Sequence, residues 1–377
     1  MPEPSTENGE SPQPTTASGT AEKKLPAFLN QSRSDIQAKF IDLEWQQRTR
    51  IAEGKQPNST SQWVFLPSDT TLPRNRYANV EVFANNRVKL KVPEGHSDYI
   101  NASPIKLKTT KSNTQKNFIA TQGPKEGIHG HIWRMVWQEC PGPAVIVMLT
   151  QTHEAGREKC FQYFPLNMEN PTMDITEDDE FNDDFKASLT LKGITEDEAT
   201  QSTIREMELK TESGESKTIW HLLFTGWPDF SIPEDDSRDA LVRLIQLSAE
   251  KNANADSPRI VHCSAGVGRS GTFIALDWLI SELEEGGFDD LDDENDPIVD
   301  LVDALRQQRM MMVQSEAQFH FLYDLTRQLW NDRQEGRKLG ELKIQNQRDA
   351  IDLSRAELEK EMQINVAQSV FRKQTDL

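Results

Sequence analysis

The chain of 377 residues is long enough for one large domain or two small ones. Charged residues make up 27% and hydrophobic residues 36%, and no stretch of about 18 apolar residues indicates a membrane span, so the composition is typical of a soluble globular protein. A formal net charge of −19 and three cysteines without metal-binding or disulfide spacing argue against nucleic-acid partners, metal sites and disulfide frameworks, and a reducing, cytoplasmic setting is expected, with the nucleus as an alternative.

The negative charge is concentrated in two segments. Residues 166–200 carry eleven acidic residues and two lysines, hence −9, and residues 284–300 carry nine acidic residues and no basic one, again −9. Residues 85–118 are basic instead, with seven lysines and arginines against two acids, hence +5. Exposed charges more than about 10 Å apart are largely screened at physiological salt, so a basic face can exist on an acidic protein. Solvated acidic loops are expected at about 166–185 and 285–297.

The first residues are rich in Ser, Thr, Pro, Glu and Gly, which predicts a disordered N-terminal tail over 1–30. A helical pattern follows over 34–52, with Ser34 or Asp35 as its N-cap. β-Branched and aromatic runs predict strands at 87–92, 99–105, 117–122, 144–150, 159–164, 186–192 and 217–225. Apolar residues at helical spacing predict helices at 127–139, 237–251, 270–284, 298–308 and 315–331. This interleaving indicates an α/β (α+β) fold with a sheet flanked by helices.

The last segment, residues 333–377, has the pattern of a charged helical tail. Ile344, Ile351 and Leu358 recur every seven residues. Three positions are too few for a sustained heptad repeat, so a coiled coil is not favoured. An amphipathic helix that packs on the domain or on a partner is expected.

The run from Val261 to Phe273, VHCSAGVGRSGTF, contains few side chains that could fill a core. Its first residues complete a strand and its last residues begin a helix, so the glycine-rich part between them is a strand-to-helix loop. Gly266 and Gly268 permit tight turns, and the N–H groups of this loop can therefore converge on one point. Together with the helix N-terminus, such a loop is suited to a phosphate-sized anion.

Cys263 is at the floor of this loop, where aligned N–H dipoles favour its thiolate. A thiolate at the centre of a phosphate site is a nucleophile directed at phosphorus. Arg269 is at the far end of the loop, and its planar guanidinium can hold two phosphoryl oxygens at once. A Walker loop is excluded because the run lacks Gly-Lys-Ser/Thr. The alternative, a buried cysteine before a helix cap, does not explain the combination of residues in HCSAGVGRSG.

HCSAGVGRSG resembles the signature of the classical, tyrosine-specific protein-tyrosine phosphatases. The resemblance extends over roughly 35–330 in the family's order, through RNRYANV, DYINAS, FIATQGP, WRMVWQE, EKCFQYFP, GWPDFSIP and QRMMMVQSEAQFHFLYDL. It implies a non-receptor enzyme that hydrolyses phosphotyrosine in proteins through a cysteinyl-phosphate intermediate and acts in intracellular signalling. It also implies a single catalytic domain over 31–332, with a central, highly twisted mixed β-sheet and no metal or other cofactor.

By the same resemblance, Asp229 in WPDF is the general acid that protonates the leaving tyrosine oxygen and later activates water. Trp227 is the hinge of the mobile loop that carries this acid. Gln314 and Gln318 position the hydrolytic water, and a spacing of four on a helix would put them on one face. Tyr77 stacks on the phosphotyrosine ring and sets the depth of the pocket.

Asn79 stands where some family members have Asp, and either residue can bond the substrate backbone. Glu154 pairs with the signature arginine, and Lys159 contacts the acid loop. His262 fixes the phosphate loop, and Ser270 donates to the sulfur and helps it leave in the second step. The other loop residues bind phosphate through backbone amides: Ser264, Ala265, Gly266, Val267 and Gly268.

Two other functions are considered. A phosphotyrosine-binding pseudophosphatase with weak catalysis would be expected to lack the cysteine, the arginine or the acid, and all three are present. A phosphatase of lipids or of phosphoserine would favour a shallower or more basic pocket. The expected substrates are tyrosine-phosphorylated proteins, with a MAP kinase as one candidate by family habit, and the basic face of 85–118 is expected to attract acidic phosphopeptides. The enzyme is expected to be a monomer.

The sequence departs from the family pattern at a few positions. Met310 and Met311 stand where Pro-Gly or a similar small residue is common. A bulky Met311 near the rim is expected to narrow access to the pocket. Phe164 replaces the usual Trp, and Ser315 replaces the usual Thr after the glutamine.

Overall fold

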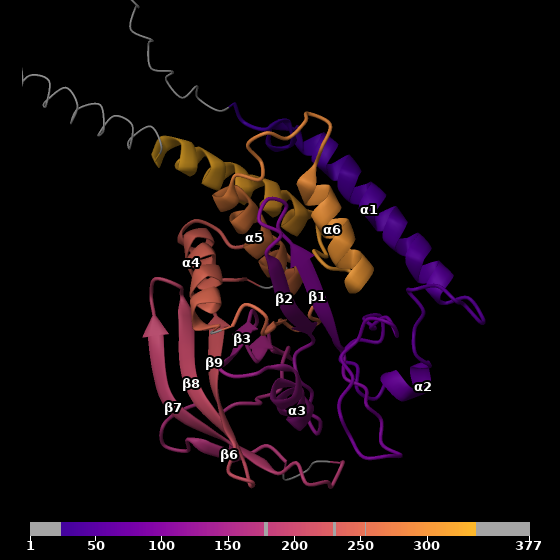
Figure 1. Cartoon of the computed structure of the whole chain (residues 1–377), viewed down its shortest axis with the longest axis vertical. Helices are drawn as coiled ribbons and strands as arrows, with labels where there is room; N and C mark the ends of the chain where they lie inside the picture. Colours follow the sequence, from indigo (N-terminus) through magenta and orange to yellow (C-terminus); the bar gives the residue numbers. More distant parts are fainter. Residues whose placement is uncertain (1–23, 177–179, 229–230, 253, 337–377) are drawn as a thin grey trace, which may run out of the picture. The chain divides into compact units, whose positions relative to one another are not determined.

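The computed structural model describes residues 24–176, 180–228, 231–252 and 254–336 (Figure 1). These residues fall into two units. One unit, Pro26–Trp330, contains all the strands and helices described below except the end of the last helix. The other contributes residues 24–25 and 331–336 to the described chain. The disorder predicted for 1–23 and the amphipathic helix predicted for 337–377 lie outside the described residues.

An eight-stranded mixed sheet forms the centre of the larger unit, in the order β1-β2-β10-β3-β9-β8-β7-β6. The four central strands run parallel: β2 (Gln115–Thr121), β10 (Arg259–His262), β3 (Ala144–Met148) and β9 (Ser216–Phe224). The outer strands pair antiparallel: β1 (Ala102–Lys108), β8 (Ser202–Thr211), β7 (Ala187–Asp197) and β6 (Thr172–Asp174). The predicted fold class, a mixed sheet flanked by helices, is confirmed.

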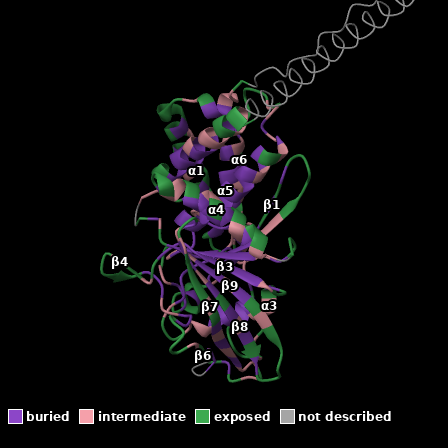
Figure 2. Cartoon of the chain, turned by 90° about the vertical axis from the view of Figure 1, so that its left-hand side faces the viewer, coloured by how far each residue is buried: buried purple, intermediate pink, exposed green. Residues whose placement is uncertain are grey.

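The central strands are apolar on both faces, as expected for parallel strands covered on two sides. Ile146, Met148 and Ile260 belong to a core cluster that also contains Trp133 of α3 (Gly130–Glu139). The alternating residues of the same strands, such as Val147, are equally buried but face the opposite way. That second face is covered by α4 (Asp236–Lys251) and α5 (Gly268–Glu285). Figure 2 shows the buried centre of the sheet and its more exposed outer strands.

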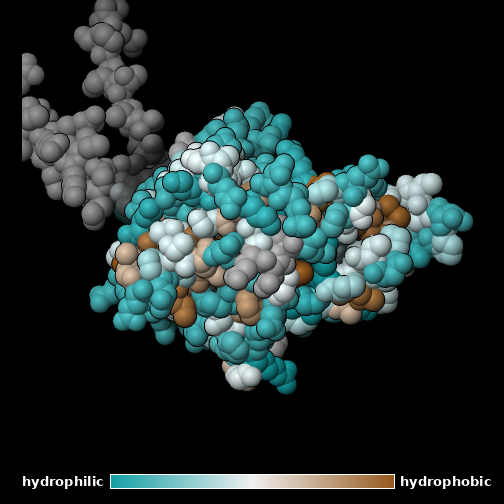
Figure 3. All heavy atoms as spheres, turned by 90° about the horizontal axis from the view of Figure 1, so that it is seen from below, coloured by the Kyte–Doolittle hydropathy of each residue, from teal (hydrophilic) through white to brown (hydrophobic). Residues whose placement is uncertain are grey.

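Two of the remaining helices pack in succession next to α5. The helix α6 (Pro297–Gln308) contacts α5 and β1, and α1 (Arg33–Gly54) contacts α6. A further helix covers 316–336, and α2 (Ser68–Thr71) is a single turn. Within the described residues, every helix predicted from apolar spacing is present. The face seen in Figure 3 is largely hydrophilic, and its apolar residues are scattered.

Some local elements differ from those predicted from the sequence. The N-cap of α1 is Ser32, whose hydroxyl accepts from Asp35 N, and not Ser34 or Asp35. Residues 1–30 were expected to be disordered, but Ala27–Asn30 form a 3-10 helix, η1, because Phe28 and Leu29 are buried.

Two predicted strands are absent as strands. Residues 87–92 form only one bridge, between Lys89 and Tyr99, and Lys91 N donates instead to the Gln138 side chain. Residues 159–164 lie in a loop, because Phe161 N bonds Pro124 O. Buried and more exposed residues alternate in 87–92 but not in 159–164, where they fall in pairs.

Strand β8 was not predicted. Seven of the ten residues in its sequence, STIREMELKT, are charged or polar. Its period-two pattern of buried Arg205, Met207, Leu209 and Thr211 includes only two apolar residues. The segment is a strand because its backbone pairs with β7 on one side and with β9 on the other, although its side chains give a weak strand signal.

The acidic segment 166–185 is not simply a solvated loop, as was expected. It contains β6, and its Phe181 is buried beside the Arg134 guanidinium, 4.5 Å from the ring centroid. Arg134 donates two hydrogen bonds of 2.8 Å to Asp183 and lowers the pKa of that carboxyl. Part of the negative charge is therefore used to hold the segment against α3.

The second acidic segment, 285–297, is held in a similar way. Asp296 caps α6 by accepting from Ile298 N, and it also accepts from Lys39 Nζ at 2.7 Å and from the Tyr323 hydroxyl at 2.8 Å. The carboxylates at 292–294 are exposed, which agrees with the expected solvated loop at that point.

His131 on α3 is buried next to two arginines. Burial is the main cause that lowers its pKa to about 3, and Arg74 and Arg134 lower it further. Its Nε2 lies 3.0 Å from Glu180 Oε1, while its Nδ1 has no hydrogen-bond partner among the described residues. This contact is therefore a hydrogen bond donated by a neutral ring, because a second N–H on the ring would have no acceptor.

This neutral histidine predicts a loss of stability in acid. Between pH 6.5 and about 3 the unfolded chain binds a proton at residue 131 that the folded chain does not, so the free energy of unfolding falls as the pH falls below 6.5. One such group contributes a slope of about 1.4 kcal/mol per pH unit. Urea unfolding of His131→Gln, measured from pH 7 to 4.5, should show a slope smaller by that amount. His153→Gln, which removes an exposed histidine, is the matched control. Equal slopes for wild type and His131→Gln would show that His131 is charged in the folded protein.

Candidate active site

The site lies where the four parallel strands end. The sheet register places Thr121, His262, Met148 and Leu223 in one row, and the chain leaves the sheet just beyond it. Ligand sites of open α/β sheets form outside the carboxyl ends of such strands. A cavity of about 420 Å³ opens here, and Cys263, the residue after β10, lies on its floor with 5% of its surface exposed.

The loop after β10 directs its carbonyl groups away from this cavity. His262 O accepts from Leu149 N at 2.9 Å, and Ser264 O accepts from Gly123 N at 2.9 Å. Farther along, Val267 O accepts from the amides of Val313 (3.2 Å) and Gly271 (3.0 Å), and Gly268 O accepts from the Thr272 hydroxyl at 2.9 Å. Each bond comes from outside the loop or from the first turn of α5.

Arg309 satisfies the two carbonyls in the middle of the loop. Its Nε donates to Gly266 O at 2.8 Å and its Nη2 to Ala265 O at 3.1 Å. The same guanidinium donates to Asn101 Oδ1 at 2.7 Å. Arg309 is fully buried, and burial lowers its pKa to about 10. The group is still protonated at neutral pH and places a positive charge behind the loop.

These carbonyl bonds orient the amides. In a trans peptide the N–H of one residue points opposite to the C=O of the residue before it. Because the carbonyls of 263–268 face outward, the N–H groups of 264–269 face the cavity. Gly266 N donates to Cys263 Sγ at 3.3 Å, as this geometry requires. The backbone of the loop thus has the geometry expected of a site for a phosphate-sized anion.

Two glycines make this approach possible. Gly266 has φ +72°, and a Cβ there would lie 2.1 Å from Thr121 O, so no side chain fits. A Cβ on Gly268 would lie 3.1 to 3.2 Å from the amide groups of Gln318 and Gln314. The second glycine leaves both glutamines room beside the loop.

A chain of neutral groups supports Cys263 from behind. The Tyr163 hydroxyl lies 2.6 Å from His262 Nε2 and 2.9 Å from His221 Nε2. Burial lowers the pKa of His262 to about 4, and burial also lowers that of His221. With neutral rings, His262 Nδ1–H donates to Cys263 O at 3.1 Å, so its Nε2 accepts from Tyr163, which in turn accepts from His221. The role predicted for His262, fixing the phosphate loop, stays a prediction.

Arg269 is held by Glu154. Its Nη1 donates to Oε1 at 2.7 Å and its Nη2 donates to Oε2 at 2.9 Å, a bidentate pair in which both side chains are largely buried. Nη1 also donates to Leu149 O at 2.9 Å. The Thr150 hydroxyl, 3.0 Å from Oε1, fixes the carboxylate itself. The guanidinium plane is therefore set before any ligand binds.

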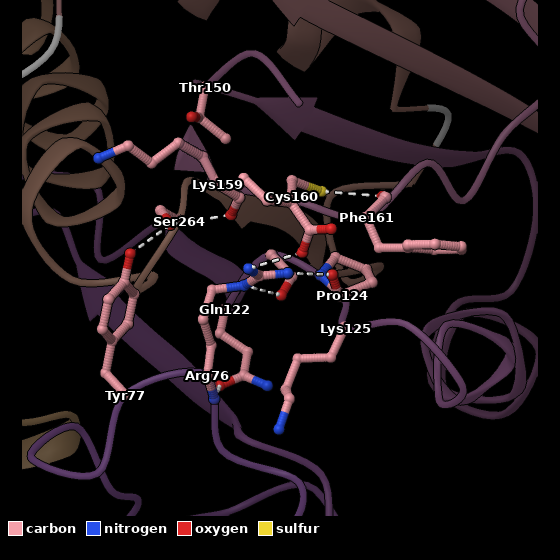
Figure 4. A network of polar contacts seen from close by, with 12 residues as sticks. Arg76, Tyr77, Gln122, Pro124, Lys125, Thr150, Lys159, Cys160, Phe161 and Ser264 are labelled. Atoms are coloured by element: carbon pink, nitrogen blue, oxygen red, sulfur yellow. Dashed lines mark hydrogen bonds and ion pairs between the residues drawn. The ribbon is translucent and has the colours of Figure 1, made fainter. Parts of the chain in front are cut away.

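Tyr77 stands at the wall of the cavity. Ser264 Oγ donates to Lys159 O at 2.8 Å, so the Tyr77 hydroxyl is the donor in its 2.8 Å contact with Ser264 (Figure 4). Asn79, two residues further, is exposed and lines the same cavity. This bond keeps the tyrosine ring at the entrance, as its predicted role requires.

Gln314 and Gln318 both line the cavity, but they are not on one face of a helix as predicted. The helix begins at residue 316, and Val313 has φ +57°. Ser315 and Gln318 form a capping box instead: Gln318 N donates to Ser315 Oγ at 3.2 Å, and Ser315 N donates to Gln318 Oε1 at 3.3 Å. Gln314 N also donates to Gln318 Oε1, at 3.0 Å. Gln318 thus positions the backbone of Gln314.

The structure brings most of the predicted site residues together around the cavity. Those lining it are Tyr77, Asn79, Glu154, Lys159, Cys263, Ser264, Ala265, Gly268, Arg269, Gln314 and Gln318. Gly266 and Val267 contribute through the backbone of the loop. Among the described residues, no group of three or more His, Cys, Asp and Glu is placed to hold a metal ion.

Comparison with known proteins identifies the family. A family model described as protein-tyrosine phosphatase matches residues 71–328. This chain belongs to the protein-tyrosine phosphatase family. The resemblance inferred from the sequence motifs is confirmed.

Several relatives are similar to this phosphatase chain. Tyrosine-protein phosphatase 1 of Saccharomyces cerevisiae is 34% identical over 330 residues, 81% of this chain and 97% of that protein. Tyrosine-protein phosphatase 2 of Schizosaccharomyces pombe is 37% identical, over 76% of this chain and 38% of that protein. The phosphatidylinositol phosphatase PTPRQ of Rattus norvegicus is 38% identical, over 68% of this chain and 10% of that protein. The chain thus spans less than two fifths of the length of the latter two.

The fold is shared with a solved phosphatase structure. The catalytic domain of human protein tyrosine phosphatase non-receptor type 18 aligns with a TM-score of 0.63 at 25% identity. The match covers 81% of this chain and 99% of that one. The helices of the described chain include none that is long and apolar enough to cross a bilayer.

Some predicted features of the phosphatase site are not seen. Asp229 lies outside the described residues, and its predicted contact with Lys159 stays a prediction. Trp227, which precedes it, is buried and donates from Nε1 to Ser231 O at 3.0 Å, which ties the two ends of this loop together. The Ser270 hydroxyl is buried and makes no hydrogen bond with any described residue, so the predicted donation to the sulfur is not formed here.

Met311 does not narrow the cavity as expected. It is not among the residues that line it, and its N donates to the Gln47 side chain. Its backbone has φ +60°, a conformation that a side chain strains, so the smaller residues common in the family match the geometry better. Met310 is buried and accepts from Glu81 N through its sulfur.

Sequence reasoning missed Arg309, whose side chain holds the two carbonyls in the middle of the loop. The only signal was an arginine beside the methionine run, which reads as a surface charge. Tyr163 was missed for a similar reason, since it reads as a core aromatic. Arg157 and Glu158 also line the cavity and were not predicted.

Arg309 can be tested by substitution. Arg309→Met removes the donors of two buried loop carbonyls, and each hydrogen bond to a charged group is worth about 1.5–3 kcal/mol. We expect inorganic phosphate to inhibit at least about tenfold more weakly, because the amides lose their orientation. Arg309→Lys keeps the charge but reaches fewer carbonyls, so its inhibition by phosphate should lie between that of the wild type and that of Arg309→Met. The inhibition constant for phosphate is the measurement, with near-UV circular dichroism to show that the variants are folded. Unchanged inhibition in a folded Arg309→Met would refute the role.

Proposed function

We propose that this chain is an active protein-tyrosine phosphatase that hydrolyses phosphotyrosine in proteins, with Cys263 as its nucleophile. The observation that supports this most is the loop whose carbonyls are bonded away from the cavity, which directs its amides toward it, with Gly266 N donating to Cys263 Sγ. Such amides are in place before substrate binds and stabilise the charge that develops on the phosphoryl oxygens. The pseudophosphatase alternative is not favoured, because the groups for turnover are present.

The first step transfers the phosphoryl group to the enzyme. The Cys263 thiolate attacks phosphorus, the phosphorus–oxygen bond to tyrosine breaks, and Asp229 gives its proton to the leaving oxygen. Arg269 and the loop amides bind the three equatorial oxygens. Because Glu154 already fixes the guanidinium, little reorganisation is needed at this step.

The second step releases phosphate. A water held by the Gln314 side chain attacks the cysteinyl phosphate, and the Asp229 carboxylate takes its proton. The sulfur leaves as a thiolate. The Ser270 hydroxyl, which bonds no described residue, is available to donate to it. Trp227 keeps its predicted role as the hinge of the acid loop.

Tyr77 supports phosphotyrosine as the substrate. Its ring lines the cavity and its hydroxyl bonds Ser264, the neighbour of Cys263, so the ring is placed to stack on a phosphotyrosine ring, which phosphoserine lacks. The related non-receptor type 18 enzyme has been solved in complex with HER2 phosphopeptides, which agrees with a protein substrate. A cytoplasmic, monomeric enzyme of signalling that needs no metal is part of this proposal, and a MAP kinase is one candidate substrate.

The nucleophile is tested with para-nitrophenyl phosphate in EDTA. We expect metal-independent turnover by the wild type and none above background by Cys263→Ser. Cys140→Ala removes a buried thiol far along the chain from the site and is the control that should stay active. If Cys263→Ser were as active as the wild type, the proposed mechanism would be wrong.

The general acid is tested by the leaving group. Asp229→Ala should lower kcat on a phosphotyrosine peptide by about 10²–10⁴-fold. The loss should be smaller on para-nitrophenyl phosphate, because that leaving group needs less protonation. An equal loss on both substrates would assign Asp229 another role.

The substrate class is tested separately. Since one relative is a phosphatidylinositol phosphatase, phosphoinositides are assayed in parallel with the phosphotyrosine peptide. If the enzyme hydrolysed the lipid faster than the peptide, phosphoinositides would replace phosphotyrosine as the proposed substrate.

A further inference from the structure

A small hairpin stands beside the cavity. Strands β4 (His153–Glu154) and β5 (Arg157–Glu158) pair antiparallel through a two-residue turn, in which Ala155 and Gly156 have φ +50° and +73°. Two positive φ values in succession are typical of the turn that fits the twist of a hairpin. Figure 2 shows β4 projecting from the body of the protein.

The pairing fixes the direction of Arg157. Glu154 and Arg157 are direct cross-strand partners, so their side chains share one face of the hairpin. Glu154 uses that face to reach Arg269 inside the cavity. Arg157 lies on the same side, is exposed to solvent, and lines the cavity.

The carboxylates nearest to Arg157 are already engaged. Glu154 accepts from Arg269, and Glu158 accepts from Arg76 Nη1 at 3.0 Å. Arg157 itself has no ion pair with any residue in the described part of the chain. It is a cation at the mouth of an anion site, with its guanidinium open to a ligand.

The two other cations that line the cavity are placed differently, because Arg269 is paired with Glu154 and Lys159 is buried, whereas Arg157 is exposed. None of the lysines and arginines of 85–118, which were expected to attract acidic phosphopeptides, lines the cavity. Two of them are paired locally, Arg87 with Asp98 at 2.8 Å and Lys116 with Asp277 at 2.6 Å. On the other wall, the segment from Tyr77 to Asn79 carries no charge.

We propose that Arg157 is a specificity-determining residue that binds an acidic side chain close to phosphotyrosine in the substrate. The inference rests on the proposed function, since it assigns a substrate class to the same site. The phosphotyrosine would occupy the floor above Cys263, and a neighbouring Asp or Glu would meet the guanidinium at the hairpin. The contact is solvent-exposed, so its strength is that of a surface ion pair.

The test compares two phosphotyrosine peptides that differ only in flanking residues, Glu in one and Gln in the other. The measured quantity is the ratio of kcat/KM for the two peptides within each variant, so a general change in activity cancels. The wild type should prefer the Glu peptide by about three- to fivefold at low salt, as expected of an exposed ion pair. Arg157→Gln should bring the ratio close to 1, and Arg157→Glu should invert it.

Arg243→Gln is the matched control. It removes the same charge from an exposed position on α4 that does not line the cavity, and it should keep the wild-type ratio. An equal preference in wild type and Arg157→Gln, or an equal loss in Arg243→Gln, would overturn the inference while leaving the proposed function intact.

Binding separates the two proposals further. The dissociation constants of the same peptides are measured by fluorescence anisotropy in the Cys263→Ser background, with and without Arg157→Gln. A charge preference that depends on Arg157 supports the inference even without turnover, and its absence refutes it. Failure of the wild type to hydrolyse either peptide would count against the proposed function alone.

Discussion

The site depends on one constraint: each peptide unit that turns its N–H toward a phosphate must turn its C=O into the protein. A buried carbonyl without a partner is costly, so a loop that binds an anion through its backbone needs a donor behind every unit. Here the donors come from segments far apart in sequence, including Leu149, Gly123, Val313 and Arg309. The loop is rigid because its outer surface is bonded, and this explains why it can be poor in apolar side chains.

The same bonds connect the phosphate loop to the wall that faces substrate. Asn101 accepts from Arg309 and donates to Asn75 Oδ1 at 2.9 Å and to Val80 O at 2.8 Å. Residues 75 and 80 flank the segment that carries Tyr77, so one buried network sets the position of both the floor and the wall. A change at Asn101 would therefore alter substrate recognition and phosphate binding together, although Asn101 touches neither ligand group.

The sequence predicted those parts of the site that lie in contiguous motifs. Cys263 and Arg269 belong to one glycine-rich run, whose chemistry follows from local geometry. Arg309 could not be predicted, because its role depends on a carbonyl 43 residues away in the chain. The helical pairing of the two glutamines failed because a capping box, rather than a helix turn, joins them. In the fold, strong apolar spacing located the long helices of the described residues but not the single turn α2. Strand β8, with few apolar residues, is a strand because it pairs with both neighbours.

A protein with a net charge of −19 can hold a doubly charged phosphate because the site does not rely on net charge. Arg269 is already neutralised by Glu154, so their pair adds little long-range attraction. In the proposed function, the anion is captured by amide dipoles at contact distance, which act in a largely buried space and are not screened as surface charges are. The acidic segments are also held by their own cations, such as Asp183 by Arg134 and Asp296 by Lys39. The charge that remains unpaired at the mouth, on Arg157, therefore acts on the residues around the phosphate more than on the phosphate itself.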